Sequence, residues 1–233
     1  MAKVLITGSN DGLGFLEAKR CVEEGAQVFL HSRSQEKLDK AVAQIPDVKD
    51  GFVADLSNKK QVLKLASDIN SEGPFDVIIH NAGVYQSSSE ELFKVNVLAP
   101  YLLTINVTTP KRLIYLSSQM HKGGSFPKSI NQLTYSDSKL WLTMLMARFS
   151  IQFPECYVNA VDPGWVPTKM GGKGAPDDLD QGAETQVWLA TSHEPDALVS
   201  GKYFYHKKEQ VPHSDAHNVT KQEELMELLS EWN

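Results

Sequence analysis

Three glycines follow the first apolar run of the chain, and they constrain its fold more than any other feature. The run MAKVLI leads directly into TGSNDGLG at residues 7–14. Gly8 permits a tight turn off a strand, Gly12 lets the backbone approach a pyrophosphate, and Gly14 lets the next helix pack closely on the sheet. A helix that begins near Leu13 would direct free amides and the positive end of its dipole at the phosphates. The residues predicted to bind a dinucleotide in this turn are Gly8, Ser9, Asn10, Gly12, Leu13 and Gly14.

Length and composition favour one domain and argue against a nucleic-acid surface. A chain of 233 residues with 41% hydrophobic residues can bury one large core, so we expect a single NAD(P)-binding domain over residues 1–233. The 23 basic and 29 acidic residues give a net charge of −6. Because contacts with nucleic-acid phosphates need a basic face, no nucleic-acid partner is expected.

Cysteine usage and hydropathy point to neither secretion nor a membrane. The two cysteines, Cys21 and Cys156, are expected to be buried free thiols. No signal sequence precedes the first apolar run, and the longest apolar stretch, LWLTMLMA, is far too short to span a bilayer. We expect a cytoplasmic protein with no membrane partner.

Short apolar runs alternate with segments of helical length along the chain, which is typical of βαβ units. Such runs predict an α/β fold, a doubly wound Rossmann-type arrangement with a mostly parallel sheet of about seven strands and helices on both faces. The long connection 168–182 is expected to be a lid over the substrate, with a solvated connection as the alternative. The predicted strands are Val4–Thr7, Gln27–His31, Gly51–Ala54, Val77–His80, Arg112–Leu116, Tyr157–Val161 and Lys202–Tyr205.

The second strand ends in HSR, where a doubly wound sheet would place the adenosine ribose. NAD sites prefer an acidic residue there, whereas an arginine can bind a 2′-phosphate through two parallel N–H donors. Ser32 and Arg33 therefore favour NADP(H), with NAD(H) as the alternative. Asp11 opposes this choice because it adds negative charge nearby, and Arg33 could instead be an ordinary solvated charge.

The ends of the third and fourth strands complete the predicted cofactor site. Asp55 is placed to accept a hydrogen bond from the adenine amino group, and the HNAG segment would let the chain pass close beneath the cofactor. The residues predicted to bind here are Asp55, Leu56, Asn81, Ala82 and Gly83.

A tyrosine lies four residues before a lysine in YSDSK, after the fifth strand. On a helix this spacing brings Tyr135 and Lys139 to one face, where an ammonium would lower the tyrosine pKa and make it an effective proton donor and acceptor. Tyr203 and Lys207 have the same spacing, but they lie in an extended run where it does not bring side chains together. We interpret that second pair as structural.

The order of these motifs resembles the short-chain dehydrogenase/reductase family over essentially the whole chain. TGSNDGLG, NAG, the pair Ser117–Ser118, YSDSK and DPGWVPT follow one another as they do in that family. YSDSKL and AVDPGWVPT are most similar to its carbonyl-reductase-like and retinol-dehydrogenase-like members. The connection between Gly83 and Asn96 is shorter than the family usually has.

The resemblance implies a role for each residue of the catalytic set. Ser118, the second serine of the pair, would hydrogen-bond the substrate oxygen, and Tyr135 would move the proton. Lys139 would adjust the pKa of the tyrosine and bind the nicotinamide ribose. Asn96 would complete a water relay behind the lysine, with a capping or solvated helix asparagine as the alternative.

The resemblance also implies that DPGWVPT holds the nicotinamide. Pro163 and Gly164 would flank the ring, while the backbone near Val166 and the hydroxyl of Thr168 would bind carboxamide and phosphate. Six side chains are expected to line a fairly apolar substrate pocket, although each is more often a core residue. They are Tyr85, Gln119, Met120, Phe126, Trp165 and Met170.

The sequence thus predicts an NADP(H)-dependent oxidoreductase acting on a small-molecule carbonyl or secondary alcohol, with homodimer and homotetramer both open. The alternative is a catalytically idle NAD(P)-binding redox sensor or scaffold, against which the complete catalytic set argues. Sugar-nucleotide chemistry would need more chain after Tyr205. No metal is expected, because His206, His213 and His217 lack ligand spacing and paired carboxylates.

Overall fold

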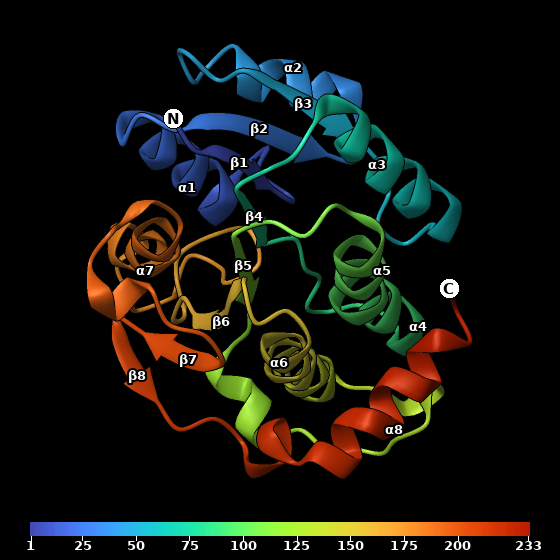
Figure 1. The fold of residues 1–233 in the computed structure, drawn as a ribbon. Helices are drawn as coiled ribbons and strands as arrows, with labels where there is room; N and C mark the ends of the chain where they lie inside the picture. The colour runs from blue at the N-terminus through green and yellow to red at the C-terminus, as the bar shows by residue number, and fades with distance from the viewer.

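Eight strands form one sheet in the computed structural model, which describes residues 1–233 (Figure 1). The strand order is β3-β2-β1-β4-β5-β6-β7-β8, and every neighbouring pair is parallel except β7 and β8. The predicted doubly wound α/β fold is therefore confirmed. The strands are β1 (Lys3–Ile6), β2 (Gln27–Ser32), β3 (Asp50–Val53), β4 (Val77–His80), β5 (Arg112–Leu116), β6 (Tyr157–Asp162), β7 (Lys202–Tyr205) and β8 (Lys208–Gln210).

The eighth strand was missed by the sequence prediction of about seven strands. All three residues of β8 are polar and exposed, so no hydrophobic alternation marks them. The hairpin that joins β7 to β8 has His206 and Lys207 at φ 49° and 60°, without the glycine or asparagine that usually marks such a turn.

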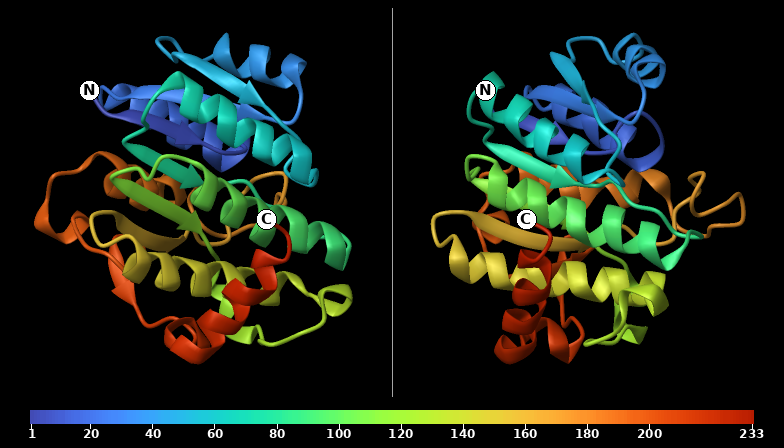
Figure 2. Two further views of the ribbon diagram at one scale, coloured as in Figure 1. Left: turned by 45° about the vertical axis from the view of Figure 1, so that its right-hand side comes forward. Right: turned by 90° about the vertical axis from the view of Figure 1, so that its right-hand side faces the viewer.

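Helices cover both faces of the sheet (Figures 1 and 2). One apolar core lies between the sheet and α1, α2 and α7, and a larger one lies between the sheet and α3, α5 and α6. The C-terminal helix α8 packs on the outer side of α6. The helices are α1 (Gly12–Glu23), α2 (Gln35–Val42), α3 (Lys59–Glu72), α4 (Ser89–Phe93), α5 (Ala99–Asn106), α6 (Tyr135–Gln152), α7 (Leu179–Thr191) and α8 (Val219–Ser230).

The predicted lid is shorter than the range 168–182. Its last four residues form the start of α7, where the side chain of Asp178 accepts a hydrogen bond from the Gln181 amide and caps the helix. Residues 168–178 carry no regular element, and the right-hand view of Figure 2 shows this segment projecting from the body of the molecule.

Both cysteines are buried free thiols, as the sequence predicted. No helix is both long and apolar enough to cross a lipid bilayer.

Candidate active site

The glycine turn and the segment after β4 are joined by hydrogen bonds. The side-chain amide of Asn81 donates to the carbonyls of Thr7 and Gly8 at 2.8 and 3.1 Å, and the Ala82 amide donates to the Thr7 hydroxyl at 3.1 Å. A side chain at position 14 would overlap the Asn81 amide, which explains the glycine there. The structure thus brings two predicted cofactor segments together.

Glycine is required at two further turn positions by backbone conformation. Gly8 and Gly12 have φ values of 64° and 57°, in the left-handed region. A Cβ atom on Gly12 would lie 3.5 Å from the methyl carbon of Thr168, so the turn after β6 reaches the glycine turn. Helix α1 begins at Gly12, next to the predicted Leu13, and its amino end faces this junction.

The residues predicted to bind the adenosine differ in their exposure. Arg33 is exposed and forms no ion pair, whereas Ser32 is fully buried and its hydroxyl accepts from the Ser34 amide at 3.3 Å. One carboxylate oxygen of Asp55 is occupied by the amide and hydroxyl of Ser57. The side chain of Leu56 belongs to the core, so it offers only its backbone to a ligand.

Asp11, whose negative charge would repel a phosphate, forms an ion pair within the protein. Its carboxylate lies 2.5 Å from the ammonium of Lys169, in the segment after β6. The ammonium of Lys169 offsets part of the repulsion that Asp11 would exert on the 2′-phosphate of NADP(H).

Tyr135 begins α6 because the residue before it caps the helix. The Thr134 side chain accepts from the Asp137 amide, and the Asp137 carboxylate accepts from the Thr134 amide at 2.8 Å. Lys128 pairs with the same carboxylate at 2.7 Å. The cap fixes the direction in which the tyrosine side chain leaves the helix.

Ser118 lies beside the Tyr135 phenol, whereas Ser117 does not. The Ser118 hydroxyl interacts with the phenol and opposes a rise in the tyrosine pKa. Ser117 is buried, and its hydroxyl pairs with Thr143 at 2.8 Å. The two serine hydroxyls therefore have different surroundings, and only that of Ser118 lies at the Tyr135 phenol.

Lys139 is a buried ammonium behind the tyrosine. Its Nζ donates to the Leu116 carbonyl at 2.6 Å and lies 5.6 Å from the centroid of the Tyr135 ring. Burial lowers the lysine pKa to about 8, and the carboxylate of Asp162 opposes that change.

The expected lowering of the Tyr135 pKa by Lys139 is wrong for this structure. Burial raises the pKa of Tyr135, and the nearby carboxylate of Asp162 raises it further. The Tyr135 hydroxyl therefore keeps its proton over the physiological pH range, which suits a proton donor.

Asn96 is buried in a π-helical turn, Lys94–Leu98, between α4 and α5. Its Oδ1 accepts from the Val84 amide at 2.8 Å, and its Nδ2 donates to the Val84 carbonyl and to the Ser138 hydroxyl. A Cβ on Gly83 would lie 3.3 Å from Asn96 Oδ1 and 3.4 Å from Lys139 Nζ, so both side chains border this glycine. The asparagine thus ties the segment after β4 to α6 instead of being solvated.

The turn after β6 contains a glycine with a positive φ, at the position of the DPG motif. Gly164 has φ 82°, and its amide donates to the Asp162 carboxylate at 3.0 Å. Val166 is buried, while the Thr168 hydroxyl accepts from the Gly171 amide at 3.2 Å. Pro163 is partly exposed at the start of this turn.

Four of the six side chains expected around the substrate are exposed apolar groups. Tyr85 packs edge-on against the Tyr135 ring at 4.8 Å between centroids. Gln119 is exposed, but Phe126 is only 5% exposed and packs on Trp141 in the core, so its assignment to the pocket is wrong. The exposed apolar side chains are Tyr85, Met120, Trp165 and Met170.

Two residues near the predicted catalytic set were not identified from the sequence. Asp162 acts on Tyr135 and Lys139, and its position in the DPG motif was a usable signal. His121 accepts the His213 amide at Nε2, 3.0 Å away, so its Nδ1 carries the proton and donates to the Ser118 carbonyl at 2.7 Å. No sequence signal predicts that contact, because 92 residues separate the two histidines.

The second tyrosine–lysine pair does not lie on a helix. Tyr203 is buried in β7, whereas Lys207 lies in the hairpin turn and pairs with Glu184 at 2.6 Å.

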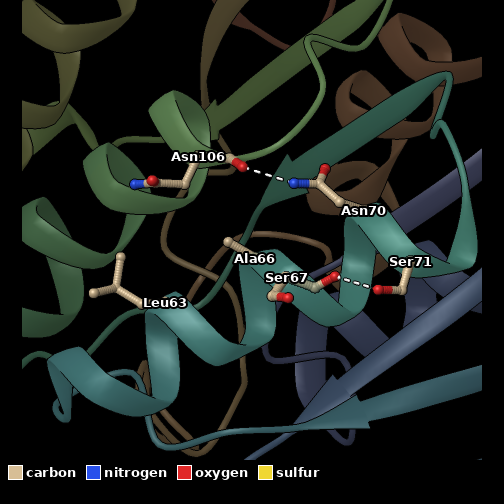
Figure 3. A pocket seen from close by; sticks show the side chains of 6 residues that line it. All are labelled: Leu63, Ala66, Ser67, Asn70, Ser71 and Asn106. Carbon is tan, nitrogen blue, oxygen red and sulfur yellow. Dashed lines mark hydrogen bonds between the residues drawn. The ribbon is translucent and has the colours of Figure 1, made fainter.

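A surface groove between α3 and α5 is not part of this site (Figure 3). Asn70 donates to the Asn106 carbonyl at 2.8 Å, and Ser71 donates to the Ser67 carbonyl at 2.9 Å. None of the predicted catalytic or cofactor residues lines it. Its lining residues are Leu63, Ala66, Ser67, Asn70, Ser71 and Asn106.

Sequence comparison identifies relatives over nearly the whole chain. The sequence model described as short chain dehydrogenase matches residues 2–178. An uncharacterized oxidoreductase of Emericella nidulans is 38% identical over 99% of this chain and 96% of its own length. The short-chain dehydrogenase chry4 of Gibberella zeae is 34% identical over 99% of this chain and 96% of its own length.

Solved structures share the fold at lower identity. The carbonyl reductase Sniffer of D. melanogaster superimposes with a TM-score of 0.72 at 21% identity, covering 91% of this chain and 99% of its own. An uncharacterized protein of Mycobacterium paratuberculosis gives a TM-score of 0.81 at 22% identity, covering 100% of this chain and 92% of its own.

Proposed function

Because the chain belongs to the short-chain dehydrogenase family, we propose that it is an NADP(H)-dependent oxidoreductase that interconverts a carbonyl and a secondary alcohol. The observation that carries this proposal is the grouping of Ser118, Tyr135 and Lys139 at the carboxyl edge of the sheet, beside the glycine turn. Oxidoreduction with NAD(P)(H) is the activity of the family, and the choice of NADP(H) rests on Arg33.

The glycine turn fits a dinucleotide. Gly12 has a positive φ and no side chain at the start of α1, and the amino end of α1 offers unpaired amides to phosphates. Arg33 is exposed and forms no ion pair, so its guanidinium can bind a 2′-phosphate. The bound nicotinamide would supply or accept the hydride.

In the reducing direction, the Tyr135 phenol gives its proton to the substrate oxygen as the carbonyl carbon gains the hydride. The Ser118 hydroxyl donates a hydrogen bond to the same oxygen and holds it near the phenol. Lys139 places a positive charge near the tyrosine oxygen as negative charge develops there. In the oxidising direction, the alcohol proton would pass to the tyrosinate, a form that the raised pKa of Tyr135 disfavours.

The side chains at the mouth of the site support an apolar carbonyl substrate. Tyr85, Met120, Trp165 and Met170 are exposed apolar groups in the segments that follow β4, β5 and β6, and Tyr85 contacts Tyr135 directly. Isolated exposed apolar residues are common, but a group beside a catalytic tyrosine favours an apolar ligand.

Replacement of the proton donor tests the proposal. Turnover is followed by NADPH absorbance with a panel of aldehydes, ketones and quinones. Tyr135→Phe is expected to lose about 100- to 10,000-fold in kcat while still binding NADPH. Tyr101→Phe, which removes the hydroxyl of a buried core tyrosine, is the matched control and should keep its activity.

Near-normal turnover of Tyr135→Phe would sink the assignment of the proton donor. The second candidate, an idle NAD(P)-binding sensor or scaffold, would be favoured if the parent protein bound cofactor but turned over no compound of the panel. The complete set of Asn96, Ser118, Tyr135 and Lys139 argues against that candidate.

A further inference from the structure

His31 is a buried histidine at the carboxyl end of β2, between two segments of the cofactor site. Its side chain is 2% exposed. On one side lies the glycine turn that follows β1, and on the other lies Ala54, which follows β3 and precedes Asp55.

Both ring nitrogens of His31 have main-chain partners. The Gly8 amide lies 3.0 Å from Nδ1, and the Ala54 carbonyl oxygen lies 3.1 Å from Nε2. Because an amide can only donate and a carbonyl can only accept, Nδ1 accepts and Nε2 carries the proton. The geometry therefore specifies one neutral tautomer.

The backbone of His31 contacts the same turn. Its amide donates to the Ser9 hydroxyl at 3.0 Å, and its carbonyl accepts from the Ser9 amide at 3.0 Å. The Ser9 hydroxyl in turn donates to the Ile6 carbonyl at 2.8 Å. The amide and the hydroxyl of Ser9 therefore both have partners within the protein, and His31 provides two of these contacts.

The neutral form is favoured by the surroundings. Burial lowers the pKa of His31 to about 4, although the Ala54 carbonyl and the Asp55 carboxylate oppose the change. A protonated ring would also place a second N–H against the Gly8 amide, where no acceptor exists.

We propose that His31 is a positioning residue for the dinucleotide: its ring fixes the first glycine of the phosphate-binding turn to the chain that binds the adenine. This inference rests on the cofactor site proposed above. Without the ring nitrogens, the partly buried Gly8 amide and the Ala54 carbonyl each lose their partner, and the two segments lose their fixed spacing. The cofactor contacts both, so its affinity depends on that spacing.

The test measures binding, separately from turnover. His31→Phe keeps a buried ring but has no hydrogen-bonding nitrogen, and it should weaken NADPH and NADH binding alike by about 10-fold in calorimetry. The kcat at saturating cofactor should change little. His31→Gln restores one donor and one acceptor and should bind more tightly than His31→Phe.

A control separates positioning from general stability. Tyr115→Phe removes a buried hydrogen bond to Thr104 of 2.7 Å in the same sheet, and it should leave cofactor affinity unchanged. A folded His31→Phe with affinity within twofold of the parent would overturn the proposal, as would His31→Gln binding no better than His31→Phe.

A measurement on the parent protein remains decisive where the variants do not fold. Long-range ¹H–¹⁵N spectra at pH 7 should show His31 neutral with the proton on Nε2, and the opposite tautomer or a protonated ring would refute the proposal. Because calorimetry and these spectra do not depend on turnover, a failure of Tyr135 as proton donor would not affect their result, and the converse also holds.

Discussion

The ammonium of Lys169 lies 2.5 Å from the carboxylate of Asp11, and this ion pair joins the segment after β6 to the glycine turn. Thr168, the preceding residue, lies against Gly12. The segment 168–178 is therefore attached at its first residues to the place where the phosphates are proposed to bind. Its remaining residues, with Gly171, Gly172 and Gly174, have a soft backbone.

We predict that Lys169→Ala loosens this segment. Both charges are exposed, so the pair contributes less than about 1 kcal/mol and amide exchange over 168–178 should quicken only a few-fold. Cofactor binding should slow exchange there in the parent. Lys173→Ala, in the same segment and without an ion pair, is the control. Equal exchange with and without NADP(H) would indicate a passive connection.

Arg33→Ala should remove most of a preference for NADPH over NADH. The 2′-phosphate adds nearly two negative charges, and a guanidinium contact at an exposed site contributes about 1.5 to 3 kcal/mol, or roughly 10- to 100-fold in affinity. Calorimetry with both cofactors measures the ratio. Lys37→Ala, an exposed unpaired cation in α2, should leave it unchanged. A parent that prefers NADH, or an unchanged ratio in Arg33→Ala, contradicts the assignment.

The pH profile of kcat/KM should fall as pH rises through about 8. Burial holds the pKa of Lys139 near that value, and the lysine loses its charge above it. Asp162 raises the pKa of both Lys139 and Tyr135, so Asp162→Asn should move this fall to lower pH. Asp177→Asn is the control, because it removes a carboxylate from the neighbouring loop that does not act on the pKa of Lys139. It should leave the fall in kcat/KM at the same pH. A profile that is flat to pH 10 would show that the lysine charge is not required.

Glu17→Gln should stabilise the protein in a pH-dependent way. Glu17 is buried between α1 and α7 without an ion-pair partner, and burial raises its pKa from 4.5 to about 8, although the side chain of Gln186 opposes the change. The folded state therefore keeps a proton that the unfolded chain loses, so parent stability falls as pH rises from about 4.5 to about 8.

The gain from Glu17→Gln should grow across that window and level off above it, reaching on the order of 3 kcal/mol near pH 7. Urea unfolding at several pH values measures it. Glu23→Gln, on the exposed side of the same helix, should show no such trend. A constant difference between parent and Glu17→Gln at all pH values would rule out a buried neutral carboxyl.

Local motifs explain why much of the site could be predicted from the sequence. Gly8, Gly12 and Gly164 adopt positive φ at fixed places in short turns, and a contiguous segment specifies each turn. The spacing of Tyr135 and Lys139 is likewise a property of one helix. The carboxyl-edge rule for parallel sheets then brings these segments together without further information.

Burial and long-range contact explain what could not be predicted. Phe126 has the composition of a pocket residue, but it packs on Trp141 in the core. The pKa of Tyr135 depends on desolvation and on Asp162, from a strand 27 residues later, more than on the lysine four residues away. β8 has no apolar residue and exists because β7 offers it a partner edge.

The hydrogen bond from the His213 backbone to His121 makes the C-terminal part of the chain a support for the serine loop. Residues 213–217 therefore help to set the direction of the Ser118 carbonyl and of the loop that carries its hydroxyl. The donor at position 213 is a main-chain amide, so the C-terminal segment supports the serine loop through the path of its backbone rather than through a particular side chain. The position of the serine loop thus depends on the end of the chain most distant in sequence from the glycine turn.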